Sequence, residues 1–574
     1  MATDSHRLLF SSQPVARISN RLCFCVDLGQ IATPTRFWNP LGAAGESLEI
    51  IGQPTFDFAR PRLRKLAAAL APAYLRIGGT EADRAYYAVD DAEEPPTTPP
   101  PPFTSVLHSW HLNAIGEFTR STGFEVIFTL NAGWGARSAQ GTWESGQMRK
   151  LLQYVRRRSI PFAVLELGNE PNAWPYLQKG LAVTPERYAI DLFALARARD
   201  DELPRALIAA PATAFFPAIG EVPTLATKGW GWPSLVSFGN YQRRVLKASE
   251  QLALPDILTW HYYPGQSDRA VGLSKWRIVA IASLLAAAIV DLSQRRAARQ
   301  AARQVPRAAR GGCSSCARPF VFALAIGAVA VCAALHAVVT PVTLASLRSP
   351  AVLDRARVWG DAVSRSAREV EPASRRPAVW LGETGSAQAG GQPGVSGRWS
   401  AALWWLDQLG SLSTLGHEVQ CRQTLSGSDY GLLHEGSLEP TPEYWVSLLW
   451  RRLMGTAVLA ASAEGGGELL RVYCHAAAKG GAARAPTCLA INLADVPVRL
   501  ELPAPRTARA LEVWLLEGVG GQLNATDLRV NGVTPKALAD GTVPSLPGAK
   551  RGAALLDGGG LVVPAIAAAF VRMG

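Results

Sequence analysis

The stretch Phe162-Ala-Val-Leu-Glu-Leu-Gly-Asn-Glu-Pro171 is an apolar run that ends abruptly in polar and turn-forming residues. Short, continuous apolar runs are typical of parallel strands that are covered on both faces. Glu170 and Asn169 therefore follow the carboxyl end of a predicted strand, which is where barrel enzymes carry their catalytic side chains. Glu383 stands in the same setting in Ala378-Val-Trp-Leu-Gly-Glu-Thr-Gly385. A lone glutamate in a loop is usually only solvated, but two glutamates in this context predict a carboxylate pair.

The alternation of apolar runs with helix-like segments extends over most of the chain. Eight predicted strands joined by helices match the count of a closed (β/α)8 barrel, so we predict an α/β fold of this type. The predicted strands are 22–27, 73–79, 124–131, 162–168, 206–210, 257–263, 379–382 and 418–421. The predicted helices are 61–71, 105–121, 144–158, 185–199, 238–252, 351–371 and 399–411.

The pattern changes at about residue 455, where short alternating runs are separated by glycine and proline turns. Such a pattern predicts an antiparallel β-sandwich. A further strand-like run precedes the barrel, and we expect it to pair into the sandwich. The expected domains are an N-terminal strand within 1–20, a catalytic barrel over 21–450 and a C-terminal β-sandwich over 451–574.

Residues 270–340 interrupt the predicted barrel between its sixth and seventh strands. They hold two apolar runs, 276–290 and 320–339, on either side of an arginine-rich segment. The second run is long enough to span a bilayer and the first is marginal. A membrane hairpin with its basic loop on the cytoplasmic side agrees with the charge pattern. Sequence foreign to the fold, such as a retained intron, and a soluble helical lid are the alternatives.

The net charge of +12 is concentrated in one part of the chain. Residues 271–318 hold nine basic residues and one acidic residue, so this segment carries +8 and the rest of the chain only +4. A general basic surface is therefore weakly supported, and we expect no nucleic-acid partner.

The eight cysteines show no framework of regular spacings. Cys23 and Cys25 lie on one face of a predicted strand, where we expect them to be small buried hydrophobes. Cys313-Ser-Ser-Cys316 has zinc-type spacing, but no second pair follows at a suitable distance. We therefore predict no metal site.

Two carboxylates at strand ends can hydrolyse a glycosidic bond without a cofactor. At about 5–5.5 Å apart, one attacks the anomeric carbon while the other protonates the leaving oxygen. Burial and a negatively charged partner raise the pKa of the acid. Asn169 is placed to bind a sugar 2-hydroxyl group. His261 and Tyr262, at the end of the sixth strand, are candidates for orienting Glu383.

The chain resembles the heparanase-like members of glycoside hydrolase family 79, within a clan of retaining enzymes. The resemblance runs from about residue 8 to the C-terminus and omits only about 270–340. It is carried by Ala73-Tyr-Leu-Arg-Ile-Gly-Gly-Thr-Glu-Ala-Asp83, Leu165-Glu-Leu-Gly-Asn-Glu-Pro-Asn172, Thr259-Trp-His-Tyr-Tyr263, Val379-Trp-Leu-Gly-Glu-Thr-Gly-Ser-Ala387, Tyr444-Trp-Val-Ser-Leu-Leu449 and Leu470-Arg-Val-Tyr473.

This resemblance implies roles for particular residues of the chain. Glu170 would be the acid/base and Glu383 the nucleophile. Two further groups would bind the sugar at the cleavage site and its uronic-acid carboxylate. These are Asp27, Thr80, Asn131 and Asn169 for the sugar, and Gly390, Gly391 and Tyr430 for the carboxylate.

Three departures from the family pattern carry expectations of their own. Secreted members begin with a signal peptide, and the resemblance implies an extracellular, lysosomal or membrane-associated enzyme. The N-terminus of this sequence, however, shows no apolar signal core. Residues 86–104 are short and proline-rich where heparanase carries a long excised linker, so we predict a single-chain enzyme. Arg137 is the one basic residue in 132–145, which favours a less sulfated glucuronide over heparan sulfate.

We therefore predict a retaining β-glucuronidase that acts on glucuronic-acid-containing glycans, such as heparan sulfate or related polysaccharides. Membrane association is predicted only through 276–290 and 320–339. The alternative is a catalytically impaired homologue, tethered to a membrane or binding glycans, because the insertion disrupts the barrel. A xylanase-like or arabinofuranosidase-like barrel enzyme would share the carboxylate pair but not the glycine-rich carboxylate clamp.

Overall fold

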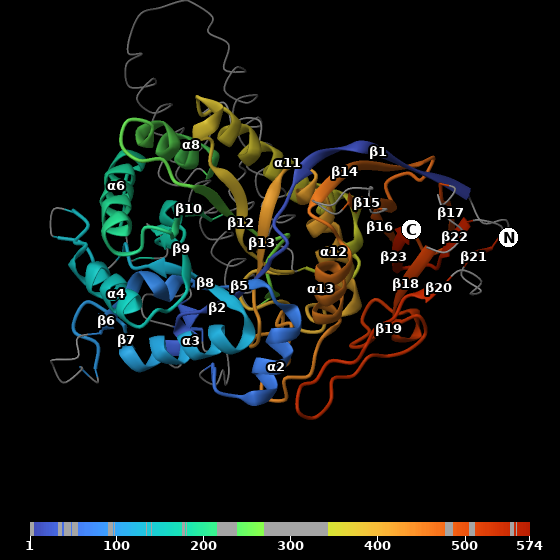
Figure 1. Cartoon of the computed structure of the whole chain (residues 1–574), viewed down its shortest axis with the longest axis horizontal. Helices are drawn as coiled ribbons and strands as arrows, with labels where there is room; N and C mark the ends of the chain where they lie inside the picture. The colour runs from blue at the N-terminus through green and yellow to red at the C-terminus, as the bar shows by residue number, and fades with distance from the viewer. Residues whose placement is uncertain are drawn as a thin grey trace, which may run out of the picture.

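The structure is a computed structural model, and its cartoon is shown in Figure 1. It describes the chain from residue 5 to residue 573 with gaps. The gaps are 33–36, 39–46, 49–55, 90–95, 97, 134, 139–140, 175–177, 179–180, 215–237, 269–341, 477–485, 504–510, 551–555 and 558–559.

Eight parallel strands close into a barrel in the order β10-β11-β12-β13-β2-β5-β8-β9, which confirms the predicted fold class. Every predicted barrel strand is present, and nearly all of the residues in each strand are buried or half-buried, as expected for strands covered on both faces. The strands are β2 (Leu22–Asp27), β5 (Ala73–Gly78), β8 (Phe124–Leu130), β9 (Phe162–Leu167), β10 (Leu207–Thr213), β11 (Ile257–Tyr262), β12 (Ala378–Thr384) and β13 (His417–Arg422).

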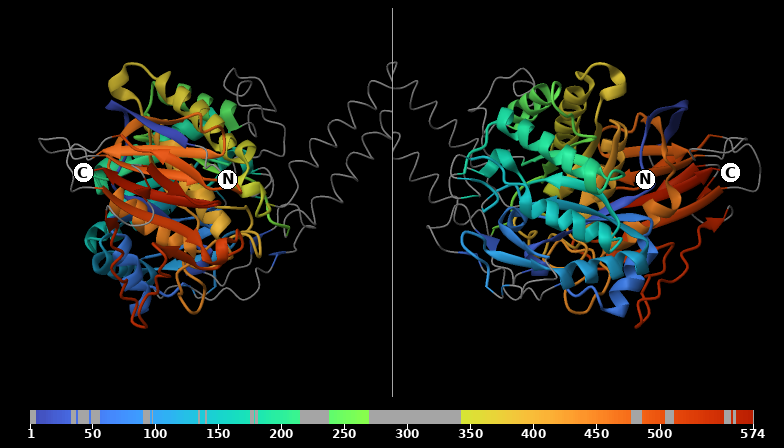
Figure 2. Two further views of the ribbon diagram at one scale, coloured as in Figure 1. Left: turned by 90° about the vertical axis from the view of Figure 1, so that its right-hand side faces the viewer. Right: turned by 60° about the vertical axis from the view of Figure 1, so that its left-hand side comes forward.

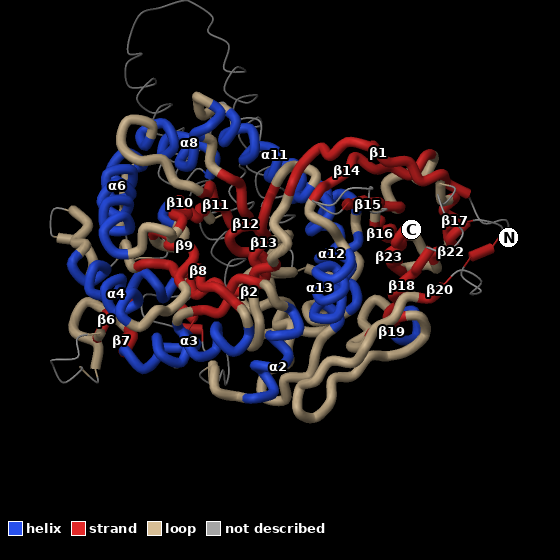
Figure 3. The backbone as a smooth tube through the Cα atoms, in the orientation of Figure 1, coloured by secondary structure: helices blue, strands red, loops and turns tan. Residues whose placement is uncertain are grey.

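Helices surround the barrel on its outside (Figure 3). Several begin with proline at their first turn, where its fixed φ and missing N–H cost nothing. The helices are α1 (Gly29–Ala32), α2 (Pro61–Leu70), α3 (Ser109–Thr122), α4 (Gly146–Arg157), α6 (Pro185–Glu202), α8 (Phe238–Ser249), α11 (Pro350–Arg368), α12 (Trp399–Ser413) and α13 (Pro442–Leu453).

A second body is an eleven-stranded sheet that contains both ends of the described chain (Figure 2). The N-terminal β1 (Ser5–Arg17) pairs antiparallel with β14 (Ala457–Glu464) and parallel with β17 (Val498–Glu501). The remaining strands are β15 (Leu470–Ala476), β16 (Thr487–Asn492), β18 (Leu511–Gly518), β19 (Leu528–Val530), β20 (Ala549–Lys550), β21 (Leu556–Asp557), β22 (Gly560–Val563) and β23 (Ala567–Met573).

The sheet is joined to the barrel through α12 and α13, which lie between the two bodies in Figure 1. One face of the sheet forms an apolar cluster of its own, whereas Tyr473, Trp514 and Phe570 belong to the large core shared with the barrel helices. The hydroxyl of Tyr473 donates to Asp407 of α12 at 2.7 Å. The barrel and the sheet therefore share one continuous core.

Two disulfides join residues that face each other on paired strands. Cys23 of β2 is bonded to Cys421 of β13, and Cys474 of β15 to Cys488 of β16. The expectation that Cys23 is only a small hydrophobe is therefore wrong. Its partner lies 398 residues away, and barrel closure brings β13 beside β2. Cys25 is buried as a free thiol.

The predicted membrane segments, 276–290 and 320–339, lie outside the described residues, as does the whole of 270–340. Among the helices that the structure describes, none is long and apolar enough to cross a membrane.

Candidate active site

The two predicted catalytic glutamates lie close together at the carboxyl ends of β9 and β12, which are separated in the barrel by β10 and β11. Glu170 follows β9, and Glu383 lies near the end of β12; both side chains are buried. Oxygen and nitrogen atoms of Glu170, His261 and Glu383 all lie within 4.8 Å of one another. The structure therefore brings together carboxylates that are 213 residues apart in the sequence.

The turn that presents Glu170 has an uncommon backbone. Gly168 has φ of 68° and Glu170 has φ of 56°, both in the left-handed region. A side chain larger than glycine rarely adopts this conformation, and such strain is concentrated at functional sites. The backbone N–H of Glu170 donates to the carbonyl of Ala212 at 3.0 Å, which ties the turn to the end of β10.

His261 of β11 bridges the two glutamates. Its Nδ1 lies 3.0 Å from Glu170 Oε1 and 3.9 Å from Glu383 Oε2. Its Nε2 lies 3.4 Å from a guanidinium nitrogen of Arg76. Because a guanidinium only donates, we assign the acceptor role to Nε2 and the hydrogen to Nδ1, which then donates to Glu170.

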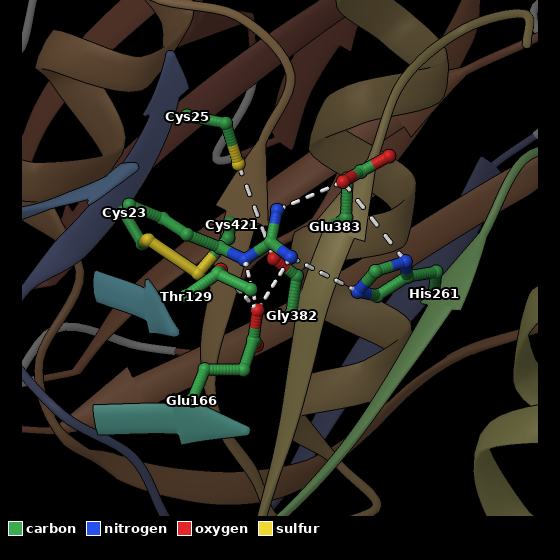
Figure 4. Close-up of a disulfide and its surroundings, with 9 residues drawn as sticks. Cys23, Cys25, Thr129, Glu166, His261, Gly382, Glu383 and Cys421 are labelled. Atoms are coloured by element: carbon green, nitrogen blue, oxygen red, sulfur yellow. Dashed lines mark hydrogen bonds and ion pairs between the residues drawn. A yellow bond between two sulfur atoms is a disulfide. The ribbon is translucent and has the colours of Figure 1, made fainter. Parts of the chain in front are cut away.

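Arg76 of β5 is buried and donates hydrogen bonds to three side chains, of which Glu166 and Glu383 are labelled in Figure 4. Its Nη1 donates to Glu383 Oε2 at 2.8 Å, and its Nη2 donates to Asn169 Oδ1 at 3.0 Å. Its Nε and Nη2 donate to Glu166 Oε1 at 3.0 and 2.6 Å. We did not single out Arg76 from the sequence. Arg76 could have been identified as a charged residue within an otherwise apolar strand, because a buried charge requires a partner.

The pKa values of the two glutamates are displaced in opposite directions. Burial raises the pKa of Glu170 above its ordinary value, although His261 opposes the effect. Burial also acts to raise the pKa of Glu383, but His261, Arg76 and the Tyr263 hydroxyl together bring it below its ordinary value. One carboxyl group is thereby favoured as the proton donor and the other as the ionised group, which is the pattern expected for an acid and a nucleophile.

Tyr263, rather than Tyr262, contacts the carboxylate pair. The Tyr263 hydroxyl donates to Glu383 Oε1 at 2.7 Å. Tyr262 lies in an apolar cluster with Trp260 and with Trp359 of α11. Because successive strand residues point to opposite faces, His261 and Tyr263 share the inner face and Tyr262 faces the helices. The hydrogen bond to Glu383 expected of Tyr262 is made by Tyr263, which the alternation starting from His261 could have identified.

Replacing Tyr263 with phenylalanine is expected to move the acidic limb of the pH–rate profile to higher pH. The lost donor stabilises the ionised form of Glu383, so its pKa rises, and the ionised fraction falls at any given acidic pH. A hydrogen bond to a charged group contributes about 1.5–3 kcal/mol, which corresponds to a displacement of about one pH unit or more. The measurement is kcat/KM on an aryl β-glucuronide across pH. Tyr262→Phe is the matched control, and an equal displacement in both variants would contradict the assignment.

The residues expected to contact the sugar differ in their surroundings. Asp27 accepts a hydrogen bond from Gln423 Nε2 at 2.8 Å, and burial together with Glu383 raises its pKa to about 7. Asn169 is buried and accepts from Arg76. Thr80 begins the 3-10 helix η1 (Thr80–Arg84) after β5. The structure thus places these three at the carboxyl ends of β2, β5 and β9, the same end of the barrel that carries the two glutamates.

Asn131 holds the loop after β8 together. Its amide nitrogen donates to the carbonyl of Ala85 at 3.0 Å, and its amide oxygen accepts from the N–H of Gly133 at 2.9 Å. Its own backbone N–H donates to the hydroxyl of Tyr87 at 2.6 Å. These contacts give Asn131 a loop-shaping role, and its contact with sugar stays a prediction.

The predicted carboxylate clamp is a turn that packs against Tyr430. Gly390 and Gly391 have φ of 82° and 86°. A Cβ atom on Gly391 would lie 2.8 Å from the backbone nitrogen of Tyr430, so only glycine fits there. A Cβ on Gly385 would lie 3.0 Å from Tyr263 and 3.2 Å from Tyr430. Tyr430 therefore packs against both the clamp turn and the segment that follows Glu383.

Glu170, His261 and Glu383 could also hold a metal ion. Among the described residues, they are the one group with suitable donor atoms. The guanidinium of Arg76 already donates to Glu383 and lies 3.4 Å from His261. Its positive charge repels a cation at this position. The arrangement favours proton transfer and nucleophilic attack over metal binding.

Replacing Arg76 with methionine is expected to lower the free energy of unfolding by about 3–5 kcal/mol, because Glu166 is left buried without its partner. Urea denaturation followed by tryptophan fluorescence measures the change. The control is Arg244→Met, which removes an exposed ion pair with Glu186 and is expected to cost less than about 1 kcal/mol. Equal losses in the two variants would show that Arg76 does not stabilise the barrel centre.

Comparison with known proteins gives a family match for part of the chain and relatives over most of it. The family model described as "Glycosyl hydrolase family 79, N-terminal domain" matches residues 51–217. Heparanase from Gallus gallus is 26% identical over 559 residues, which is 89% of this chain and 87% of that protein. Baicalin-beta-D-glucuronidase from Scutellaria baicalensis is 33% identical over 169 residues, which is 29% of this chain and 31% of that protein.

Among solved structures, a 4-O-alpha-L-rhamnosyl-beta-D-glucuronidase from Fusarium oxysporum has a similar fold, with a TM-score of 0.58. The alignment covers 99% of this chain and 100% of that chain at 14% sequence identity. At this identity the likeness establishes the barrel and the attached sheet as a shared fold.

Proposed function

We propose that this chain, a heparanase-like glycoside hydrolase of family 79, hydrolyses β-glucuronidic bonds with net retention of configuration. The observation that carries the proposal is the proximity of Glu170 and Glu383, whose nearest oxygens lie within 4.8 Å. Retaining enzymes hold their two carboxyl groups about 5–5.5 Å apart, whereas inverting enzymes leave about 6.5–9.5 Å for a water molecule. The opposite pKa displacements of the two groups support the same division of roles.

In the first step, an oxygen of Glu383 attacks the anomeric carbon while Glu170 gives its proton to the glycosidic oxygen. The bond from the anomeric carbon to that oxygen breaks, and an ester between the sugar and Glu383 forms. In the second step, Glu170 takes a proton from water, which attacks the same carbon and releases Glu383. Arg76 and Tyr263 hold the two oxygens of Glu383 and so fix the direction of attack.

Glucuronide is the proposed substrate class because of the turn next to Glu383. Gly390 and Gly391 have left-handed backbone, and a Cβ on Gly391 would lie 2.8 Å from the Tyr430 backbone nitrogen, so the turn packs against Tyr430. The family resemblance implies that backbone N–H groups of such a turn bind the uronic-acid carboxylate. We place the uronic-acid carboxylate there. The names of the related proteins, two of which are glucuronidases and one a heparanase, support the same class.

A weakly sulfated glycan is favoured over a highly sulfated one. Arg137 is buried, forms an ion pair with Asp191 at 2.8 Å and donates to the carbonyls of Ala132 and Gly141. Its charge is therefore paired inside the protein and does not contribute to binding sulfate groups.

The test is hydrolysis of phenyl β-glucuronide by the purified chain, with the first product followed by proton NMR. The expected first product is the β-anomer of glucuronic acid, which then mutarotates. Phenyl β-glucoside, which lacks the carboxylate, is the control and is expected to react much more slowly. An α-anomer as first product would exclude the retaining mechanism, and equal rates on both substrates would exclude the carboxylate clamp. Comparing heparan sulfate with its unsulfated precursor tests the sulfation preference.

A further inference from the structure

We infer that Asp83 is a positioning residue that holds the turn carrying Glu170 against the loop that follows β8. The kinetic consequences of this inference rest on the proposed function, because Asp83 would position Glu170, the proposed acid. Asp83 lies in η1, immediately after β5, and its side chain is completely buried. It belongs to neither the carboxylate pair nor the proposed sugar-binding residues.

The carboxylate of Asp83 accepts hydrogen bonds from two different loops. Its Oδ2 accepts from the backbone N–H of Asn169 at 2.8 Å and from Nε1 of Trp174 at 3.0 Å. Its Oδ1 accepts from the backbone N–H of Ala132 at 3.2 Å. One side chain on the loop after β5 therefore links the loops after β8 and β9.

Glycines on both loops allow the backbone to close around this carboxylate. A Cβ atom on Gly133 would lie 2.8 Å from the Cβ and the carbonyl oxygen of Asp83. A Cβ atom on Gly168 would lie 3.1 Å from Asp83 Oδ1 and 2.8 Å from the Trp174 ring. Glycine at both positions therefore allows the two loops to approach Asp83 this closely.

The contact with Asn169 fixes the strained turn directly. The N–H that Asp83 accepts lies between Gly168 and Glu170, the two residues with left-handed backbone. Trp174 Nε1 also donates to the carbonyl of Asn169, at 2.8 Å. Asp83 and Trp174 therefore hold the peptide groups on both sides of the Asn169 Cα, and the direction of the Glu170 side chain follows from them.

The N–H groups of Ala132, Asn169 and Trp174 all donate to Asp83, so both of its carboxyl oxygens act as acceptors, although burial raises its pKa to about 7. In Asp83→Asn the shape is kept, but one oxygen becomes an amide nitrogen that faces a donor. At least one of the three contacts must then be lost. The turn is expected to relax toward ordinary backbone angles, which moves Glu170 away from the leaving oxygen.

The kinetic test compares substrates that differ in their need for an acid. Phenol is a poor leaving group that requires protonation, whereas 2,4-dinitrophenolate leaves without it. A misplacement of about 1 Å can cost about 100-fold in rate. For Asp83→Asn we expect kcat/KM on phenyl β-glucuronide to fall about 100-fold. On the dinitrophenyl substrate, kcat/KM reports formation of the ester alone and is expected to fall less than about 10-fold.

The matched control is Asp407→Asn, which alters another buried aspartate that accepts a side-chain hydrogen bond, at the junction with the sheet. It is expected to affect the two substrates equally. An equal loss on both substrates for Asp83→Asn would overturn the positioning role and leave a general defect in folding.

A second measurement does not depend on the reaction. Hydrogen–deuterium exchange of Asp83→Asn is expected to be faster in peptides covering 128–137 and 162–174, and unchanged in β2 and β13. Unchanged exchange in the two loops would overturn the inference. If the unmutated chain has no glucuronidase activity, the proposed function fails, while the exchange result still decides whether Asp83 holds the two loops together.

Discussion

Glu383→Gln is expected to lower kcat on phenyl β-glucuronide by at least about 10⁴-fold, the scale seen when a group that acts in covalent catalysis is removed. Glutamine keeps the size of the side chain, but its one amide oxygen can accept from only one of the two donors, Arg76 and Tyr263, and its neutral amide is a poor nucleophile. Rates are measured with the purified variant under saturating substrate, and circular dichroism checks that the fold is retained.

The assignment of Glu383 has a stereochemical signature as well. In Glu383→Gly, the vacated space admits azide, which attacks the anomeric carbon of a dinitrophenyl β-glucuronide directly. A single displacement inverts the centre, so the product is expected to be the α-glucuronyl azide. Glu186→Gln, at an exposed ion pair, is the control and is expected to retain full activity. Turnover in Glu383→Gln close to that of the unmutated chain would show that the nucleophile lies elsewhere.

Glu170→Gln is expected to lower kcat on phenyl β-glucuronide by about 10²–10⁴-fold, the range contributed by general acid–base catalysis. Formation of the ester from a dinitrophenyl substrate is expected to be nearly unaffected, because that leaving group needs no proton. Water attack on the ester then becomes slow, so a burst of dinitrophenolate should precede a slow steady state. Added azide is expected to accelerate the second step and to give the β-glucuronyl azide.

The pH dependence separates the two glutamates further. The raised pKa of Glu170 sets the basic limb, because activity falls as pH rises through it and the acid loses its proton. The lowered pKa of Glu383 sets the acidic limb, because activity falls as pH drops and the nucleophile becomes protonated. Glu170→Gln is expected to remove the basic limb and keep the acidic one. A basic limb that survives in this variant would assign the acid to another residue.

The charges around the pair favour the proposed chemistry. With Glu170 protonated, the guanidinium of Arg76 faces the carboxylates of Glu166 and Glu383, which leaves one negative charge in a buried site. The transition state of glycoside hydrolysis has oxocarbenium character, so a net negative environment stabilises it. Arg76 thus keeps Glu383 ionised without cancelling the charge that the reaction uses.

The arrangement of the eight barrel strands could be predicted from the sequence because its cause is local. Each strand is an apolar run of the length of a buried parallel strand, and each is separated from the next by a segment of helical periodicity. The position of Glu170 after β9 and of Glu383 at the end of β12 follows from the same runs. In parallel strands, the carboxyl ends lie at one edge, so the meeting of the two glutamates was also predictable.

Contacts that depend on register and closure could not be predicted in this way. Cys23 pairs with Cys421 only because β13 closes the barrel against β2. Arg76 contacts Glu383, 307 residues later, because both side chains point into the barrel at similar heights. Barrel closure also decides which face of β11 turns inward; once His261 is on that face, the alternation selects Tyr263 over Tyr262.

The sequence by itself therefore determined the strands, their order along the chain and the pair of glutamates at their ends, because apolar runs and their terminating residues are properties of neighbouring positions. Only the tertiary structure decided which atoms surround that pair. A shift of one residue in strand register turns every side chain to the opposite face. The partners of Glu170 and Glu383, and with them the pKa of each group, are consequently set by how the barrel closes.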